Sequence, residues 1–211
     1  MIHLEQGIAA VTSGSITLEW AAASQAKVEG EESGDGILVR VDSQRVLLAV
    51  ADGAGHGASA AAARAACLAA IAASDVADLE HLFEQAHQSC GSTRGVALGL
   101  AAIDLAHCSL VWAAIGEIGG VLLQHRSLST STHGIIQRGG ALGHQLPSAI
   151  LQWHDLSQGD QITLFSDGVR PKIDQHYGGH SAASAARRIL DCYASTNDDA
   201  LVLVAYCRAP R

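Results

Sequence analysis

The sequence predicts a layered α/β protein built on mainly antiparallel sheets. Apolar, β-rich segments arrive in blocks, with helical segments between the blocks. The strict alternation of strand and helix that a doubly wound parallel sheet requires does not occur. Aromatic residues make up only 4% of the chain. The core is therefore expected to consist of Ala, Val, Leu and Ile, which favours close packing of helices on sheets.

The N-terminal half is expected to form one strand, a hairpin and two helices. We place them at residues 16–20, 37–41, 46–51, 59–73, and from Ser74 or Asp75 as the cap to about residue 89. The first segment alternates apolar and polar residues, and the next two are β-rich runs around a polar turn. The first helical segment is rich in Ala and lacks Pro and Gly. In the second, apolar residues recur at helical spacing.

The C-terminal half is expected to begin with a meander of three strands. These strands are placed at residues 94–104, 109–115 and 119–124, and further elements at 161–165 (strand), 181–193 (helix) and 201–207 (strand). The last strand is almost continuously apolar, as expected for a strand buried on both faces. Residues 125–154 show no clear periodicity and are predicted to be loop-rich.

Composition excludes several classes of function. Acidic residues outnumber basic ones by 21 to 13, and no basic cluster is present that would neutralise a nucleic-acid backbone. The five cysteines are scattered and predict neither disulfides nor a zinc site. No signal peptide and no apolar stretch long enough to span a bilayer is found. We therefore expect one cytoplasmic domain over residues 1–211 that binds neither nucleic acid nor membrane.

Aspartates stand at the ends of the most apolar strands. Asp52 and Asp167 each end such a strand and are followed by Gly, and Asp198 and Asp199 precede the final strand. Asp35 opens the first hairpin. Any one of these sites is more simply explained as a turn, because Asp and Gly are turn residues. Together they predict a metal centre, because gathered carboxylates need a cation, and ligands that are all oxygen suit Mg²⁺ or Mn²⁺.

These motifs resemble those of a known family. The segment Val50-Ala-Asp-Gly-Ala-Gly-His-Gly57, followed by a helix, resembles the Ala-Asp-Gly-x-Gly-x-Gly signature of the metal-dependent type 2C (PPM) protein phosphatases. Ser166-Asp-Gly168 resembles their Thr-Asp-Gly motif, Asp198-Asp199 their closing pair, and Ser33-Gly-Asp35 their early Gly-Asp. The chain is most similar to the SpoIIE-like branch and its stand-alone RsbX type. This resemblance implies a four-layer α-β-β-α sandwich.

The resemblance also implies a ligand set for two divalent cations, Mn²⁺ or Mg²⁺. Asp52 would bridge the two ions, and the Gly53 carbonyl would complete one coordination sphere. Asp167 and Asp198 would bind the first ion. Asp35 would contact the second ion, directly or through water.

Further residues near these ligands have weaker roles or depart from the family pattern. Asp199 is expected to lie in the second shell, and His56 is a candidate acid or phosphate contact inside the glycine loop. The family's closing motif usually has Thr where this chain has Leu201. Its Gly-Asn or Gly-His after the meander strand is replaced here by Gly-Glu, with Glu117 at the second position.

The resemblance implies a phosphoserine/phosphothreonine protein phosphatase in which a metal-activated water attacks the phosphorus. The substrate would be a phosphorylated bacterial regulator of the STAS-domain, stressosome or partner-switching type, and the phosphatase a monomer or weak dimer. Two alternatives remain open. One is a pseudophosphatase that binds its partner without turnover, and the other is a two-metal phosphatase of a small metabolite.

Overall fold

The computed structural model describes residues 2–9, 15–42, 45–74, 78–126, 129–170 and 181–210. One sheet contains, in spatial order, β1 (His3–Ala9), β2 (Thr17–Gln25), β12 (Ala200–Arg208), β11 (Gln161–Phe165), β7 (Gly119–Arg126) and β8 (Ser129–Gly134). The other contains β10 (Gln152–Asp155), β6 (Ser109–Ile115), β5 (Val96–Asp104), β4 (Arg45–Gly53) and β3 (Asp35–Val41). The short β9 (Gln137–Arg138) pairs with β6 in parallel, whereas the named strands otherwise pair antiparallel.

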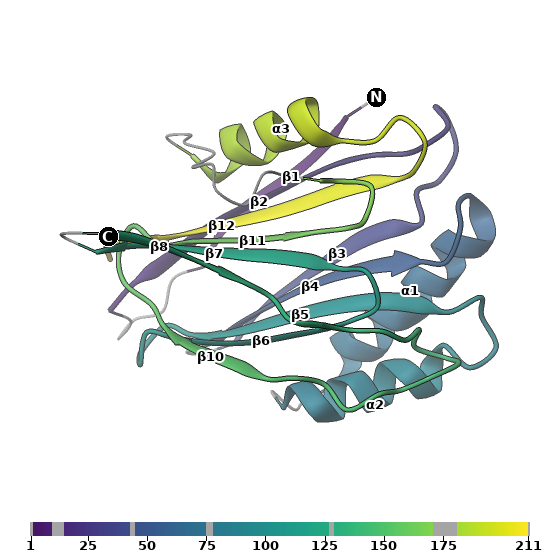
Figure 1. The fold of residues 1–211 in the computed structure, drawn as a ribbon, viewed down its shortest axis with the longest axis horizontal. Helices are drawn as coiled ribbons and strands as arrows, with labels where there is room; N and C mark the ends of the chain where they lie inside the picture. Colours follow the sequence, from purple (N-terminus) through teal and green to yellow (C-terminus); the bar gives the residue numbers. More distant parts are fainter. Residues whose placement is uncertain are drawn as a thin grey trace.

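Helices cover the outer faces of both sheets (Figure 1). The helices α1 (Ala58–Ala73) and α2 (Leu79–Ser89) pack on the sheet that contains β4, and α3 (Ala182–Tyr193) packs on β2 and β12. This arrangement confirms the predicted four-layer sandwich with mainly antiparallel sheets. Among the described residues, no helix has both the length and the apolarity needed to cross a membrane.

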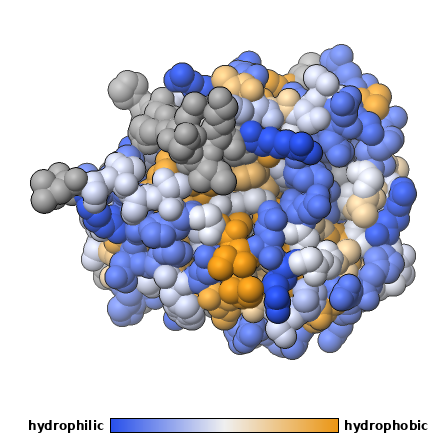
Figure 2. All heavy atoms as spheres, in the orientation of Figure 1, coloured by the Kyte–Doolittle hydropathy of each residue, from blue (hydrophilic) through white to orange (hydrophobic). Residues whose placement is uncertain are grey.

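The main core lies between the two sheets. Because side chains alternate along a strand, every second residue of β4 points inward, and Val46, Leu48 and Val50 are buried there. The opposing residues of β12, Leu201 and Leu203, close this core from the other sheet. Hydrophilic residues dominate the face in Figure 2, where the largest group of apolar residues lies in the lower middle of the view.

Most predicted elements are confirmed, but the start of the second helix was wrong. Asp78 caps α2 with its side chain, which accepts a hydrogen bond from the Glu80 amide. Ser74 instead ends α1, where its own amide donates to the Ile71 carbonyl, and Asp75 lies outside the described residues.

Four strands were missed in the sequence. The strand β1 was not predicted, and β8, β9 and most of β10 lie within residues 125–154, which were predicted to be loop-rich. Each forms through backbone pairing with a neighbouring strand, and their residues are mostly exposed. Strands of this kind carry little of the apolar alternation on which the prediction depends.

Candidate metal centre

The inward-facing rows of one sheet end in carboxylates. In β4 the buried row of Val46, Leu48 and Val50 continues with Asp52, two residues further on. Asp35 begins β3 directly opposite Asp52, as its register partner. Since cross-strand partners lie on the same face of a sheet, both carboxylates belong to the inner face and stand at one end of the core.

The inward-facing rows of the other sheet end in polar residues at the same place. Ser166 follows the buried Leu164 of β11, and Asp199 precedes the buried Leu201 of β12. The Ser166 amide donates to the Leu201 carbonyl over 3.0 Å, and the Ser166 hydroxyl accepts from the Leu201 amide, also over 3.0 Å. This end of the sandwich is therefore polar from both sheets, although the core behind it is apolar.

Three of the predicted metal ligands line one cavity of about 480 Å³. These are Asp52, Asp167 and Asp198, and Glu117 joins them in the wall. The rest of the lining consists of small or short residues and one amide: Ala54, Gly55, Val96, Ala97, Gly116, Gln137, Gly139, Gly140 and Ala141. The structure thus brings together the carboxylates that follow β4 and β11 and precede β12.

The fourth predicted ligand faces another way. Asp35 is only 4% exposed and lines a separate groove of about 520 Å³, between β2 and the α1–β3 side. Its Oδ2 accepts a 2.6 Å hydrogen bond from the Ser166 hydroxyl. Asp35 is adjacent to Asp52 across the strand pair, but its carboxylate is held by the protein itself.

The glycines that follow the aspartates are needed for packing. A Cβ on Gly53 would lie 2.1 Å from the Ala60 carbonyl oxygen of α1, and a Cβ on Gly168 would lie 1.9 Å from the Asp199 carbonyl oxygen. Side chains cannot approach so closely. The space that glycine leaves at both positions is therefore filled by the backbone of the protein itself.

Two carboxyl groups at this end of the sandwich, Asp52 and Asp35, have raised pKa values. Burial, followed by repulsion from Asp35 and the other carboxylates, raises the pKa of Asp52 to about 9. Burial likewise raises the pKa of Asp35 to about 7, against the opposing effect of the Ser166 hydrogen bond. Such shifts mean that the ionised carboxylates lack a compensating positive charge.

Asp167 interacts with a residue that the sequence marked only as a departure from the family pattern. Burial raises the pKa of Asp167, and so do the Asp198 carboxylate and Glu117, whose carboxyl group shares a hydrogen bond with Asp167. Arg170 lowers the same pKa. Glu117 is therefore a member of the site, and an acidic residue in a motif that usually carries Asn or His was the available signal.

Two residues given secondary roles lie at the edges of the cluster. Asp199 is buried and accepts hydrogen bonds from the amides of Lys27 and Gly34, each over 2.7 Å. His56 is exposed and faces Glu31, with Nδ1 3.7 Å from the carboxylate oxygen. The structure thus places Asp199 behind the carboxylates and His56 outside the residues that line their cavity.

The donor set of the cavity suits a hard cation. Its charged groups are carboxylates, and oxygen ligands are those preferred by Mg²⁺ and Mn²⁺. Within the described ranges, no three Asp, Glu, His or Cys side chains already form a metal-binding cluster. The raised pKa values of Asp35 and Asp52 are what a divalent cation would reverse. The residues present therefore fit a divalent metal.

The four-layer sandwich with carboxylates at one end of its core is the architecture of the type 2C protein phosphatases. The family model for stage II sporulation protein E (SpoIIE) matches residues 42–201. The chain belongs to this SpoIIE family. No curated protein matches the sequence significantly.

Solved structures agree with this assignment. A chain solved in work on the bacterial stressosome as a modular system that controls secondary messenger signalling is 27% identical, with a TM-score of 0.78, and the match covers 96% of this chain and 99% of that one. RsbX in complex with magnesium is 18% identical, with a TM-score of 0.80 and coverage of 98% and 100%. The catalytic domain of the serine/threonine phosphatase PstP with two manganese ions is 22% identical, with a TM-score of 0.63 and coverage of 92% and 99%.

Proposed function

We propose that the protein is a metal-dependent phosphoserine/phosphothreonine protein phosphatase whose catalytic domain spans residues 1–211. The observation that carries this proposal is that Asp52, Asp167 and Asp198 line one cavity, where acidic neighbours and burial raise the pKa values of Asp52 and Asp167. The SpoIIE family model and the phosphatase fold support the same activity.

We assign the ligands as follows. Asp52 would bridge two divalent cations, Mg²⁺ or Mn²⁺, and the Gly53 carbonyl would join one of them. Asp167 and Asp198 would hold the first ion, and Asp35 would contact the second, directly or through water. Bound there, the ions would supply an activated water near neutral pH and neutralise phosphoryl oxygens. The magnesium in RsbX and the manganese ions in PstP support this choice of cation.

The residues around the carboxylates favour a protein substrate. The cavity wall is built largely from Ala and Gly and offers few groups that would grip a metabolite. A second cavity of about 440 Å³, lined by Arg170, Tyr193 and Ser195 among others, shares Asp167 and Asp198 with the first. The carboxylates therefore stand between two adjoining hollows, and an extended polypeptide fits such a surface better than a small molecule does.

We propose that the substrate is a phosphorylated regulator of the STAS-domain or stressosome type. The likeness to a stressosome-associated chain and to RsbX supports this class. The proposed phosphatase acts as a monomer or weak dimer in the cytoplasm.

One observation favours a second function, a pseudophosphatase that binds a phosphoprotein without turnover. The hydrogen bond between Glu117 and Asp167 occupies a carboxylate that the proposed centre needs for metal. The two functions differ in whether metal displaces this contact.

The test is release of phosphate from an aryl phosphate in the presence of Mn²⁺. Wild type should be active, and both Asp52→Asn and Asp167→Asn should fall to background. Equal background rates in all three would reject the phosphatase and favour the pseudophosphatase. If wild type is active, a phosphorylated STAS-domain protein should be a better substrate than the aryl phosphate. Rapid turnover of a phosphorylated metabolite, with no action on any phosphoprotein, would instead indicate a metabolite phosphatase.

A further inference from the structure

One basic residue stands within the alanine-rich helix α1. The Arg64 side chain is 20% exposed, and its Nη1 donates to the carbonyl oxygens of Ser33 and Asp35, each over 3.1 Å. Its Nη2 donates to Glu32 Oε1 over 2.8 Å. Gly36 leaves room for the Arg64 stem, because a Cβ there would lie 2.3 Å from Arg64 Cδ. Arg64 therefore hydrogen-bonds to the backbone on both sides of Gly34.

The same short segment is held from two other directions. The Gly34 amide donates to Asp199 Oδ2 over 2.7 Å, and the Gly34 carbonyl accepts from the Gly53 amide over 3.0 Å. The Arg64 guanidinium thus donates to two carbonyls, and the Asp199 carboxylate accepts from an amide. Hydrogen bonds with a charged partner are stronger than those between neutral groups. Two of these contacts come from residues next to proposed ligands: Gly53 follows Asp52, and Asp199 follows Asp198. Among the described residues, Arg64 is the helix residue whose side chain hydrogen-bonds to this segment.

We infer that Arg64 is a positioning residue of the metal centre. Its guanidinium fixes the backbone that carries Asp35, so that the Asp35 carboxylate stands beside Asp52. This inference rests on the proposed function, because it takes Asp35 as a contact of the second ion. A planar guanidinium suits two carbonyls and a carboxylate together, whereas a lysine ammonium is a single point charge on a flexible stem. The groups facing Arg64 contribute one charge, that of Glu32, which lies 63% exposed at the rim.

The experiment is a calorimetric titration of metal-free full-length protein with Mn²⁺. Arg64→Met should weaken one of the two Mn²⁺ equivalents by about 10- to 100-fold, the loss typical of residues that orient metal ligands. Arg64→Lys should lie between Met and wild type. Glu32→Gln is the matched control: it removes the exposed ion pair but keeps both carbonyl contacts, and it should change affinity by less than about twofold.

A purely structural role predicts a different result. In that case Arg64→Met would lower Tm in EDTA but leave both Mn²⁺ affinities unchanged, and this outcome would overturn the inference. If Arg64→Met does not fold, the ordering of wild type, Arg64→Lys and Glu32→Gln decides the question. Under the inference, saturating Mn²⁺ restores the kcat of Arg64→Lys, because the defect lies in occupancy.

Failure of the proposed function is distinguishable from failure of this inference. A wild type that binds two Mn²⁺ ions but hydrolyses no phosphoester rejects the phosphatase, and the affinities of the Arg64 variants still decide the role of Arg64. A wild type that binds no Mn²⁺ rejects both. Normal hydrolysis and normal Mn²⁺ affinity in Arg64→Met reject the positioning role alone.

Discussion

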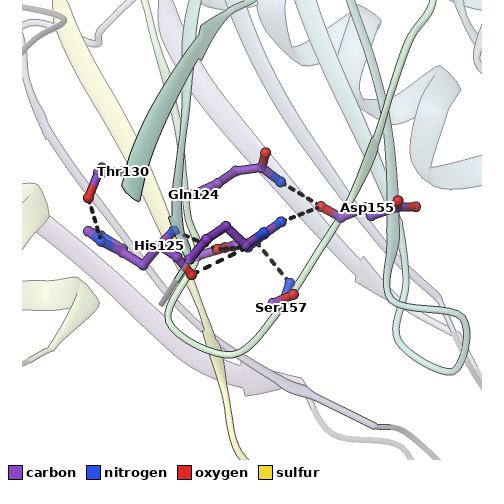
Figure 3. Close-up of polar contacts among 7 residues, drawn as sticks. Gln124, His125, Thr130, Asp155 and Ser157 are labelled. Atoms are coloured by element: carbon purple, nitrogen blue, oxygen red, sulfur yellow. Dashed lines mark hydrogen bonds and ion pairs between the residues drawn. The ribbon is translucent and has the colours of Figure 1, made fainter. Parts of the chain in front are cut away.

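The two ends of strand β11 carry aspartates in opposite electrostatic states. At its start, Asp160 is fully buried and accepts from Arg126 at 2.8 and 3.0 Å, from the His125 amide at 3.0 Å and from the Ser157 amide at 2.9 Å. Figure 3 shows this network around His125 and Ser157. At the other end, past Phe165, carboxylates face one another across a cavity.

The difference shows what burial of a carboxylate requires. A buried charge is tolerated when a cation and several donors surround it, and the protein supplies all of these to Asp160. Asp52 is also part of the inward-facing core, but its nearest charged neighbours are acidic, and its pKa rises to about 9. The carboxylate of the first end is paired within the described residues, whereas at the second end acidic neighbours raise the pKa of Asp52. Substitutions at the two ends should therefore have opposite signatures.

The largest effect is expected for Asp52→Asn. Loss of the proposed bridging carboxylate should lower kcat by about three orders of magnitude or more, the scale seen when one member of a cooperating catalytic set is removed. Metal-free protein should become more stable at pH 8, because Asp52 must take up a proton on folding at this pH and an amide need not. Phosphate release and thermal unfolding in EDTA measure the two effects. If Asp52→Asn is less stable than wild type but turns over substrate normally, Asp52 is a purely structural residue, as Asp160 is.

The next largest effect is expected for Arg126→Met, at the opposite end. Removing the cation leaves Asp160 buried with only amide donors, and breaking a buried pair typically costs about 3–5 kcal/mol. We expect about 3 kcal/mol, the lower limit, because Arg126 is 38% exposed. Urea unfolding measures this loss, and kcat under native conditions should stay within about twofold of wild type. A large fall in kcat in folded protein would contradict the separation of the two ends.

The third prediction concerns pH. Folded Asp52 has a pKa of about 9 and folded Asp35 one of about 7, against 3.8 for the ordinary carboxyl. Between these values the folded state holds protons that the unfolded state has lost. The free energy of unfolding of metal-free protein should therefore fall as pH rises from about 4 towards 9. A fall of about 2 kcal/mol corresponds to roughly 4–8 °C in Tm for a chain of this size.

Metal should oppose this trend, because binding to carboxylates displaces protons. Unfolding scans from pH 5 to 9, in EDTA and in Mn²⁺, measure both effects. Asp52→Asn is the control and should flatten the slope above pH 7, where Asp35 is already ionised. A wild-type Tm in EDTA that rises across this range would show that the carboxylates are compensated by the fold.

The sequence predicted the strongly apolar elements and the aspartates at their ends. The motif around Asp52 is local, and two of its partners in the cavity, Asp167 and Asp198, were recognisable because each adjoins an apolar strand. Edge strands such as β1 and β8 were missed because backbone pairing stabilises them, with little burial of side chains.

The contacts that complete the site are long-range and leave little trace in the sequence. Arg64 reaches the carbonyls of residues 31 and 29 positions earlier, and the Ser166 hydroxyl reaches Asp35 across 131 positions. Spacing along the chain cannot reveal such pairs, because they depend on how the two sheets meet. A single Arg in a helix of alanines and a hydroxyl beside an Asp-Gly pair were the only local signs.

The smallest effect is expected for Ser166→Ala, which tests how Asp35 is joined to the rest of the centre. The hydroxyl donates to Asp35 and accepts from the Leu201 amide, so its loss leaves one buried amide without that partner and removes a bond that favours ionised Asp35. We expect a loss of about 1–2 kcal/mol of stability and Mn²⁺ binding weakened by about tenfold. Ser166→Thr keeps the hydroxyl and should retain near wild-type affinity. If Ser166→Ala and Ser166→Thr weaken Mn²⁺ binding equally, the size of the side chain and not its hydrogen bond controls this position. Asp35 would then be a structural carboxylate held by the protein itself, as Asp160 is.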